Sequence, residues 1–409
     1  MPDIYFFMKP TPFLQRTTTT VVAMTVTQAI AVLVLMTIPV MATEIASDFG
    51  VNATDIAPFM SLVFFAAMFS SAASGSFIQK FGGIRANQIG MAFSACCLLL
   101  ALPVYLPLLF FSALLIGLGY GPNTPAGSHI LNKTTPPQHR GFVFSLKQSG
   151  APLGGLICGL LVPFLVTHLG WQSAIWATIG IAFFGVIAIQ PLRKRLDQDR
   201  NASLSLEFIS PRTAVESIIW NTPLRSLTSV AVCLTTIQSA VMAFMVIYLV
   251  QKINLSFPTA GAIFALSQAS GAITRVGVGW LADRKLGAKI TLILMGVCSA
   301  LSIASLSLMD TNSPHAAIIT NCVLLGCFSF GWNGVFLAEV ANISDPKEVG
   351  VATGGSLFFI YGGMVFGPIL MSALIRLSGN YVLPFFLIAT VTILACLFLL
   401  PNRAGKLSI

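Results

Sequence analysis

Charged residues are scarce in this sequence. Only 9% of its 409 residues are Asp, Glu, Lys or Arg, whereas 56% are hydrophobic. A soluble domain has about 25% charged residues, so the composition excludes an ordinary soluble protein and indicates an integral membrane protein that contacts the lipid bilayer. The net charge of +9 is explained by membrane orientation, and we expect no nucleic-acid partner.

Residue patterns typical of catalytic and metal sites are also missing. The four histidines are scattered without ligand spacing, and all eight cysteines fall in apolar stretches, where a thiol behaves as a small hydrophobic group. The glycine-rich "GLGYGPNTPAG" at 117–127 lies within an apolar stretch, without the strand that a nucleotide site requires. We therefore expect no disulfide, no metal, no cofactor and no enzymatic activity.

Twelve apolar stretches are long enough to cross a bilayer, since a helix needs about 20 apolar residues for a hydrocarbon core of about 30 Å. They lie at 18–41, 56–79, 84–103, 105–131, 141–166, 171–191, 224–250, 257–281, 288–309, 314–341, 350–376 and 380–401. The sequence thus predicts an all-α membrane protein with twelve transmembrane helices.

Lysine and arginine set the orientation, because basic residues are retained on the cytoplasmic side of a membrane. With both termini in the cytoplasm, only Lys252 and Arg376 of the 22 basic residues fall outside, and only Lys147 and Arg275 lie well inside spans rather than at their ends. Residues 1–17 contain no cleavable signal pattern. We predict a protein of the plasma membrane, or of a bacterial inner membrane, with both termini cytoplasmic.

Two halves of the chain resemble each other. "VAMTVTQ", ending at Gln28, matches "VCLTTIQ", ending at Gln238, and "GPN" at 121–123 matches "GWN" at 331–333, both at an offset of 210 residues. These matches indicate a duplicated six-helix unit, an organisation typical of secondary transporters whose site lies between repeats. The predicted domains are an N-terminal half at 1–191, a cytoplasmic linker at 192–223 and a C-terminal half at 224–409.

Two loops carry a further repeat, "GSFIQKFGGIR" from Gly75 and "GWLADRKLGAK" from Gly279. They resemble the G-x-L-a-D-R-x-G-R-K-like signature of the major facilitator superfamily, and the resemblance extends over essentially the whole chain. It implies a monomer with two pseudo-symmetric six-helix halves. The gating residues that it implies are Gly75, Gly82 and Arg85 in the first copy and Gly279, Asp283, Arg284 and Gly287 in the second.

The signature has a physical logic, because its glycines let helices approach closely and its aspartate accepts hydrogen bonds at a neighbouring helix N-terminus. By resemblance, Asp283 would dock near residues 350–354 when the transporter faces outward. The first copy has Gln79 in place of the aspartate. We therefore expect the latch of the N-terminal half to lack its charge.

Two cations lie inside the spans. Lys147 and Arg275 are each six residues from the cytoplasmic end of a span, a depth of about 9 Å. Their side chains could bend back to the interface. However, the resemblance places the fifth and eighth spans side by side, and the only acid within a predicted span is Glu339, near the end of the tenth. Two unpaired cations in a poorly hydrated cavity are readily explained if an anion completes the site.

Other polar residues complete the candidate binding site: Gln28, Asn123, Gln148, Gln238, Gln268, Asn333 and Tyr361. Hydrogen bonding between helices is the alternative role for the amides, and plain packing is the alternative for the tyrosine. The segment "SGAPLGG" at 149–155 loosely resembles a motif of the superfamily, and we interpret it as a helix-packing segment.

We predict a secondary transporter that moves a small organic anion by alternating access. Arg275 would grip a carboxylate through its planar fork, and Lys147 would add a mobile charge; an arginine in the eighth span resembles one in anion-carrying branches of the superfamily. If protons accompany the anion, the substrate or Lys147 would carry them. The alternatives are multidrug or metabolite efflux, which generally needs a membrane-embedded carboxylate for cationic drugs, and a transporter-like sensor or membrane enzyme.

Overall fold

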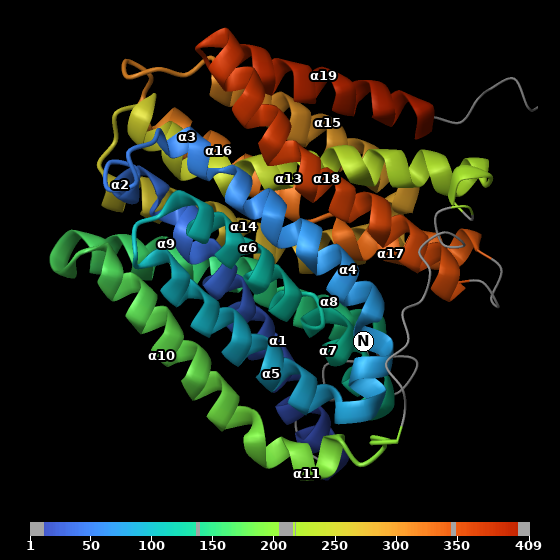
Figure 1. The fold of residues 1–409 in the computed structure, drawn as a ribbon. Coiled ribbons are helices and arrows are strands. Elements are labelled where there is room, and N and C mark those ends of the chain that lie inside the picture. The colour runs from blue at the N-terminus through green and yellow to red at the C-terminus, as the bar shows by residue number, and fades with distance from the viewer. Residues whose placement is uncertain (1–11, 136–139, 204–215, 217, 345–348, 400–409) are drawn as a thin grey trace, which may run out of the picture.

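A computed structural model of the chain describes residues 12–135, 140–203, 216, 218–344 and 349–399, and all regular secondary structure in these residues is helical. Figure 1 shows the long helices packed side by side. The first part contains α1 (Pro12–Val40), α2 (Ala42–Ile45), α3 (Ala53–Ile56), α4 (Pro58–Phe81), α5 (Gly83–Cys97), η2 (Leu98–Ala101), α6 (Leu106–Tyr120), α7 (Asn123–Thr134), α8 (Arg140–Gln148), α9 (Gly150–Leu169), α10 (Trp171–Ile189), η4 (Gln190–Leu192) and α11 (Arg193–Leu196). The second part contains α13 (Thr222–Gln251), α14 (Phe257–Leu281), η5 (Ala282–Leu286), α15 (Ala288–Ser307), α16 (His315–Phe330), α17 (Asn333–Ile343), α18 (Val349–Ser378) and α19 (Val382–Leu399).

Eleven helical segments of the described chain are long and apolar enough to cross a membrane. The remaining predicted span is α14, which has 25 residues and carries the polar side chains of Gln268 and Arg275. This helix packs against α9 and α16, and both polar side chains are buried in the protein. The chain is therefore an integral membrane protein, and each of the twelve predicted stretches corresponds to a helix or a broken helix.

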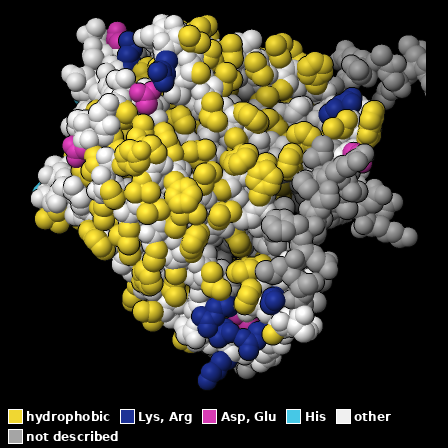
Figure 2. All heavy atoms as spheres, viewed as in Figure 1, with side chains coloured by type: hydrophobic (Ala, Val, Ile, Leu, Met, Phe, Trp, Pro, Cys, Tyr) yellow, Lys and Arg dark blue, Asp and Glu magenta, His cyan; other side chains and the backbone are white. Residues whose placement is uncertain are grey.

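The outer surface of the bundle matches a hydrocarbon environment. Large apolar side chains such as Phe184, Leu377 and Phe398 are exposed, and Figure 2 shows that hydrophobic side chains cover the face over α4, α18 and α19. Basic side chains gather in that view near the end of the bundle where α11 lies. Such a surface is stable when acyl chains cover its apolar middle.

The internal repeat produces the same helix break twice. The fourth predicted span is divided between α6 and α7, and the tenth is divided between α16 and α17. The second helix begins at Asn123 in one case and at Asn333 in the other, the two positions related by the offset of 210 residues. Because a break frees backbone groups that a continuous helix would satisfy, the carbonyl oxygen of Phe330 at the second break accepts a hydrogen bond from the side chain of Arg275.

The two signature loops also turn in the same way. Gly82 ends α4 with a φ of +91°, and Gly287 ends η5 with a φ of +73°; glycine adopts this left-handed region without steric cost. A Cβ on Gly75 or Gly279 would meet no described atom within 4 Å, so a close approach of the described helices does not require either glycine in this conformation. The side chains of Asp283 and Arg284, and residues 345–348, lie outside the described part of the chain.

A carboxylate from another segment binds the first signature loop. Asp197 follows α11, and its two oxygens accept hydrogen bonds from the backbone N–H groups of Ile84 at 2.8 Å and Arg85 at 3.1 Å. The side chain is only 2% exposed, and a Cβ on Gly82 would lie 2.2 Å from its Cγ. The loop that has Gln79 instead of aspartate therefore receives its negative charge from the end of the sixth span, at the positive N-terminus of α5.

We expect Asp197→Asn to destabilise the protein by about 1.5–3 kcal/mol, because an amide replaces a charged acceptor with one oxygen and one donor group. The measurement is the melting temperature in detergent micelles. Asp199→Asn is the matched control, since Asp199 is 41% exposed and pairs with Lys133 and His129, and exposed pairs contribute about 0–1 kcal/mol. Equal melting temperatures for the two variants would contradict a structural role for Asp197.

Glycines on α9 confirm that "SGAPLGG" is a packing segment. A Cβ on Gly150 would lie 2.3 Å from the carbonyl oxygen of Thr25 in α1, so this face of α9 touches the backbone of its neighbour. The opposite face approaches α14, where a Cβ on Gly159 would lie 2.7 Å from the carbonyl oxygen of Gly261. Since α1 and α14 belong to different predicted halves, α9 is a close-packed contact between them.

Candidate functional site

Lys147, near the end of α8, is 1% exposed. Its Nζ donates to Oε1 of Gln28 at 2.7 Å and to Oε1 of Gln148 at 3.2 Å. Its stem lies against Gly127 of α7, where a Cβ would be 2.8 Å from Cε of the lysine. In this conformation the ammonium group therefore does not bend back to a surface, and both of its acceptors are neutral amides.

Gln28 joins the lysine to three other helices. The side chain lies on α1 and is buried, its Nε2 donates to the hydroxyl of Tyr120 at 3.4 Å, and its Oε1 also accepts from the hydroxyl of Thr124 at 3.4 Å. Thr124 is absent from the residues predicted for the site, although it directly follows Asn123. A threonine hydroxyl is common in apolar helices, so its sequence position alone gives no signal.

Arg275 of α14 is 5% exposed, and its hydrogen-bond partners are two main-chain carbonyl groups. Nε and Nη2 donate to the carbonyl oxygen of Phe330 at 3.1 and 2.8 Å, and Nη1 donates to that of Gln148 at 2.7 Å. Phe330 ends α16, and Pro152 lacks the N–H that would otherwise bond the Gln148 carbonyl within a helix. The arginine thus satisfies carbonyl groups at two helix breaks, and three of its five N–H groups are occupied.

Both cations donate hydrogen bonds to the same residue, Gln148. Lys147 binds the side chain of Gln148, and Arg275 binds its main-chain carbonyl. None of the ion pairs found among the described residues includes either cation. Two buried positive charges, held only by neutral oxygens, leave the site electrostatically incomplete, because a buried charge is costly without a counter-charge.

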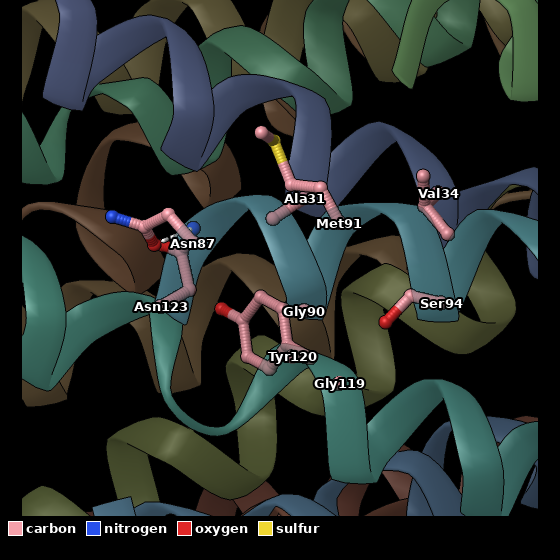
Figure 3. A pocket seen from close by; sticks show the side chains of 9 residues that line it. All are labelled: Ala31, Val34, Asn87, Gly90, Met91, Ser94, Gly119, Tyr120 and Asn123. Carbon is pink, nitrogen blue, oxygen red and sulfur yellow. Dashed lines mark hydrogen bonds between the residues drawn. The ribbon is translucent and has the colours of Figure 1, made fainter. Parts of the chain in front are cut away.

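Asn123 lies beside this group and pairs with Asn87, which was not among the residues predicted for the site. Its Nδ2 donates to Oδ1 of Asn87 at 3.1 Å, and Figure 3 shows the two side chains pointing toward each other beside the ring of Tyr120. These residues line a pocket of about 10 Å³, close to the space that one water needs. An asparagine in an apolar span was the available signal for Asn87.

The predicted residues of the C-terminal half are more dispersed. Gln238 and Asn333 each have a buried side-chain atom without a hydrogen-bond partner, Oε1 and Nδ2 respectively. The side chain of Gln268 packs on Gly155, where a Cβ would lie 2.8 Å from its Cδ. Among the described contacts, these three residues do not bind the cations directly. These residues remain candidates for hydrogen bonding to another part of a substrate.

Aromatic rings connect the last predicted residue to the lysine group. Tyr361 of α18 stacks on Phe64 of α4, with centroids 6.3 Å apart and an angle of 25°. Phe64 in turn meets Tyr120 edge to face at 6.0 Å. Tyr361 therefore belongs to a wall of three rings that ends at the hydroxyl bonded by Gln28.

The opposite end of the bundle is held by a separate contact. Nη1 of Arg376, near the end of α18, lies 3.3 Å from Oδ1 of Asp55 in α3, and the hydroxyl of Ser372 donates to the carbonyl oxygen of Thr54 at 3.0 Å. Both interactions join the two predicted halves beyond the cation site. They close this end of the interface between α4 and α18 in the present conformation.

Residues 24–354 match the family model of the Major Facilitator Superfamily, and the chain belongs to this family. It is 24% identical over 305 residues to a putative niacin/nicotinamide transporter of Bacillus subtilis, covering 71% of this chain and 72% of that one. It is 23% identical over 354 residues to a probable chloroplastic anion transporter of Oryza sativa subsp. japonica, covering 80% and 66%.

The solved structure of a mutant of the nucleoside transporter NupG has the same fold, with a TM-score of 0.74 and 14% sequence identity, covering 93% of this chain and 98% of that chain. Several curated relatives are longer than the region they share with this chain, which spans between 62% and 66% of their length. These similarities identify a membrane transporter family and its fold.

Proposed function

We propose that this protein is a secondary transporter that moves a small organic anion, such as a carboxylate, across the plasma membrane by alternating access. The observation that carries the proposal is the pair of buried cations, Lys147 and Arg275, whose described partners are all neutral oxygens. An anion between them would supply the missing counter-charge. The name of the rice relative, an anion transporter, is in line with this substrate class.

Lys147 is the better candidate for direct contact with the anion. The fork of Arg275 is engaged with Phe330 and Gln148 in this conformation, whereas the acceptors of the lysine are side-chain amides that can rotate away. We assign to Arg275 the second role of holding the helix breaks together and adding positive potential. Its predicted direct grip on a carboxylate would require release of at least one carbonyl group.

The transport cycle would use the two ends of the interface in turn. The contacts of Asp55 and Ser372 with α18 and α3 close one end, and their release would open it. Binding of an anion to the cations would favour the conformation in which both halves surround it, because a ligand stabilises the state that it binds more tightly. We propose a monomeric carrier with both termini cytoplasmic.

The test is uptake by the purified protein in proteoliposomes. We expect labelled small carboxylates to accumulate inside, and a matched set of neutral and cationic compounds to remain at the level of empty vesicles. An imposed inward proton gradient is expected to raise carboxylate accumulation if protons accompany the anion. Transport of cationic compounds without carboxylate transport would overturn the proposal and favour efflux of drugs.

A further inference from the structure

A large apolar cavity lies away from the cation site, between α4, α13, α18 and α19. Its volume is about 600 Å³, within the range of roughly 300–1,000 Å³ that is usual for ligand sites. Residues from all four helices line it, among them Met68, Cys233, Gly362, Met371, Leu387 and Val391. Because α4 belongs to the predicted N-terminal half and the other three helices to the C-terminal half, the cavity crosses the boundary between them.

The two hydroxyl groups among the described lining residues already donate their protons to carbonyl oxygens. The hydroxyl of Thr236 donates to the carbonyl oxygen of Val232 at 2.8 Å, and that of Thr392 donates to the carbonyl oxygen of Ile388 at 2.7 Å. Both threonine hydroxyl groups are therefore bonded within their own helices. A water needs two to four polar partners, so a cavity of this chemistry accepts hydrocarbon rather than water or a charged substrate.

The cavity opens to the surface that faces the bilayer. Phe366, on its edge, is 68% exposed, whereas Met371 in its wall is 2% exposed. The lining on α18 runs from Phe358 to Leu374, which is about 24 Å along a helix and longer than one leaflet, about half of a 30 Å hydrocarbon core. Hydrophobic side chains cover this face of the bundle in Figure 2.

We propose that this cavity is a lipid site that holds one acyl chain of a membrane phospholipid, entering from the leaflet nearer the turn between α18 and α19. The cavity lies in the membrane-spanning part of the helices, where acyl chains are the surrounding medium, and its apolar lining disfavours water and charged occupants. The acyl chain would lie between α4 and α18. Occupancy of the cavity would therefore change when the two halves of the protein move relative to each other.

The test uses the protein in vesicles of phosphatidylethanolamine whose acyl chains carry a photoreactive diazirine, followed by mass spectrometry of the labelled peptides. In the wild type we expect the recessed side chain of Met371 to be labelled well above Ile38, which is fully buried elsewhere. Labelling of Met371 no higher than that of Ile38 would overturn the proposal without any variant.

Gly362→Leu provides the matched variant. A Cβ at Gly362 would meet no described atom within 4 Å, so a leucine can occupy part of the cavity without a clash at its Cβ. We expect it to lower labelling of Met371 severalfold. The control is Gly180→Leu on α10, where the space around the Cβ is also open, and where labelling of Met371 is expected to stay unchanged. Equal labelling of Met371 in the wild type and Gly362→Leu would contradict an acyl chain in this cavity.

Discussion

Replacing Lys147 with methionine is expected to lower the uptake of small carboxylates by roughly 100- to 4,000-fold, because loss of one partner of a buried charge pair costs about 3–5 kcal/mol and each 1.4 kcal/mol is tenfold. We expect no loss of stability in the ligand-free protein. The variant removes an uncompensated buried charge, which offsets the two hydrogen bonds to Gln28 and Gln148. The measurements are initial uptake rates in proteoliposomes and the melting temperature in detergent.

The control for this variant is Lys133→Met, which removes the same charge from an exposed pair with Asp199 at the end of α7. We expect wild-type uptake from the control. If Lys147→Met also transports carboxylates at the wild-type rate, the buried lysine has a structural role only and the proposed anion site is wrong.

Replacing Arg275 with alanine is expected to abolish uptake and also to lower the melting temperature, unlike the change at Lys147. The variant leaves the carbonyl groups of Phe330 and Gln148 without their donor, and each buried unsatisfied group costs about 1–3 kcal/mol. The same two assays measure both effects. Their combination distinguishes a residue that maintains the helix breaks from one that only contacts the substrate.

Arg275→Lys keeps the charge but loses the planar fork, so a single ammonium group replaces the three N–H donors that bind the two carbonyl groups. We expect partial recovery of stability and little recovery of uptake. Wild-type uptake by the alanine variant would exclude any role of Arg275 in transport, and wild-type stability of that variant would exclude its role at the breaks.

The sequence predicts the helices well because their signals are local. Long apolar stretches and the matches at Gln28, Gln238, Asn123 and Asn333 identify the spans and the repeat, and the repeat reappears as the same break at "GPN" and "GWN". The close contact of Lys147 with Gln28 spans 119 positions of the chain. Both residues are identifiable as polar groups in apolar spans, but their pairing depends on packing.

Two features could not be predicted from the sequence: the carboxylate bound at the first signature loop and the hydrogen-bond partners of Arg275. Both depend on contacts between residues that are distant in sequence. Gln79 indicates that the first loop lacks its own carboxylate, yet no local pattern shows that Asp197 reaches Ile84 and Arg85 across more than a hundred residues. Similarly, the fork of Arg275 was expected to face a substrate. Its engagement with Phe330 follows from a carbonyl freed at a helix end, which is visible only in three dimensions.

The position of Asp197 determines where the chain can be divided into two polypeptides. A fragment ending at residue 191 would lack the carboxylate at the start of α5 and also the hydrogen bond from the N–H of Asn201 to the carbonyl oxygen of Gln79. The first twelve residues of the predicted linker thus belong structurally to the N-terminal half. Co-expressed halves should be separated after residue 203, and insertions that lengthen the connection should be placed beyond that residue.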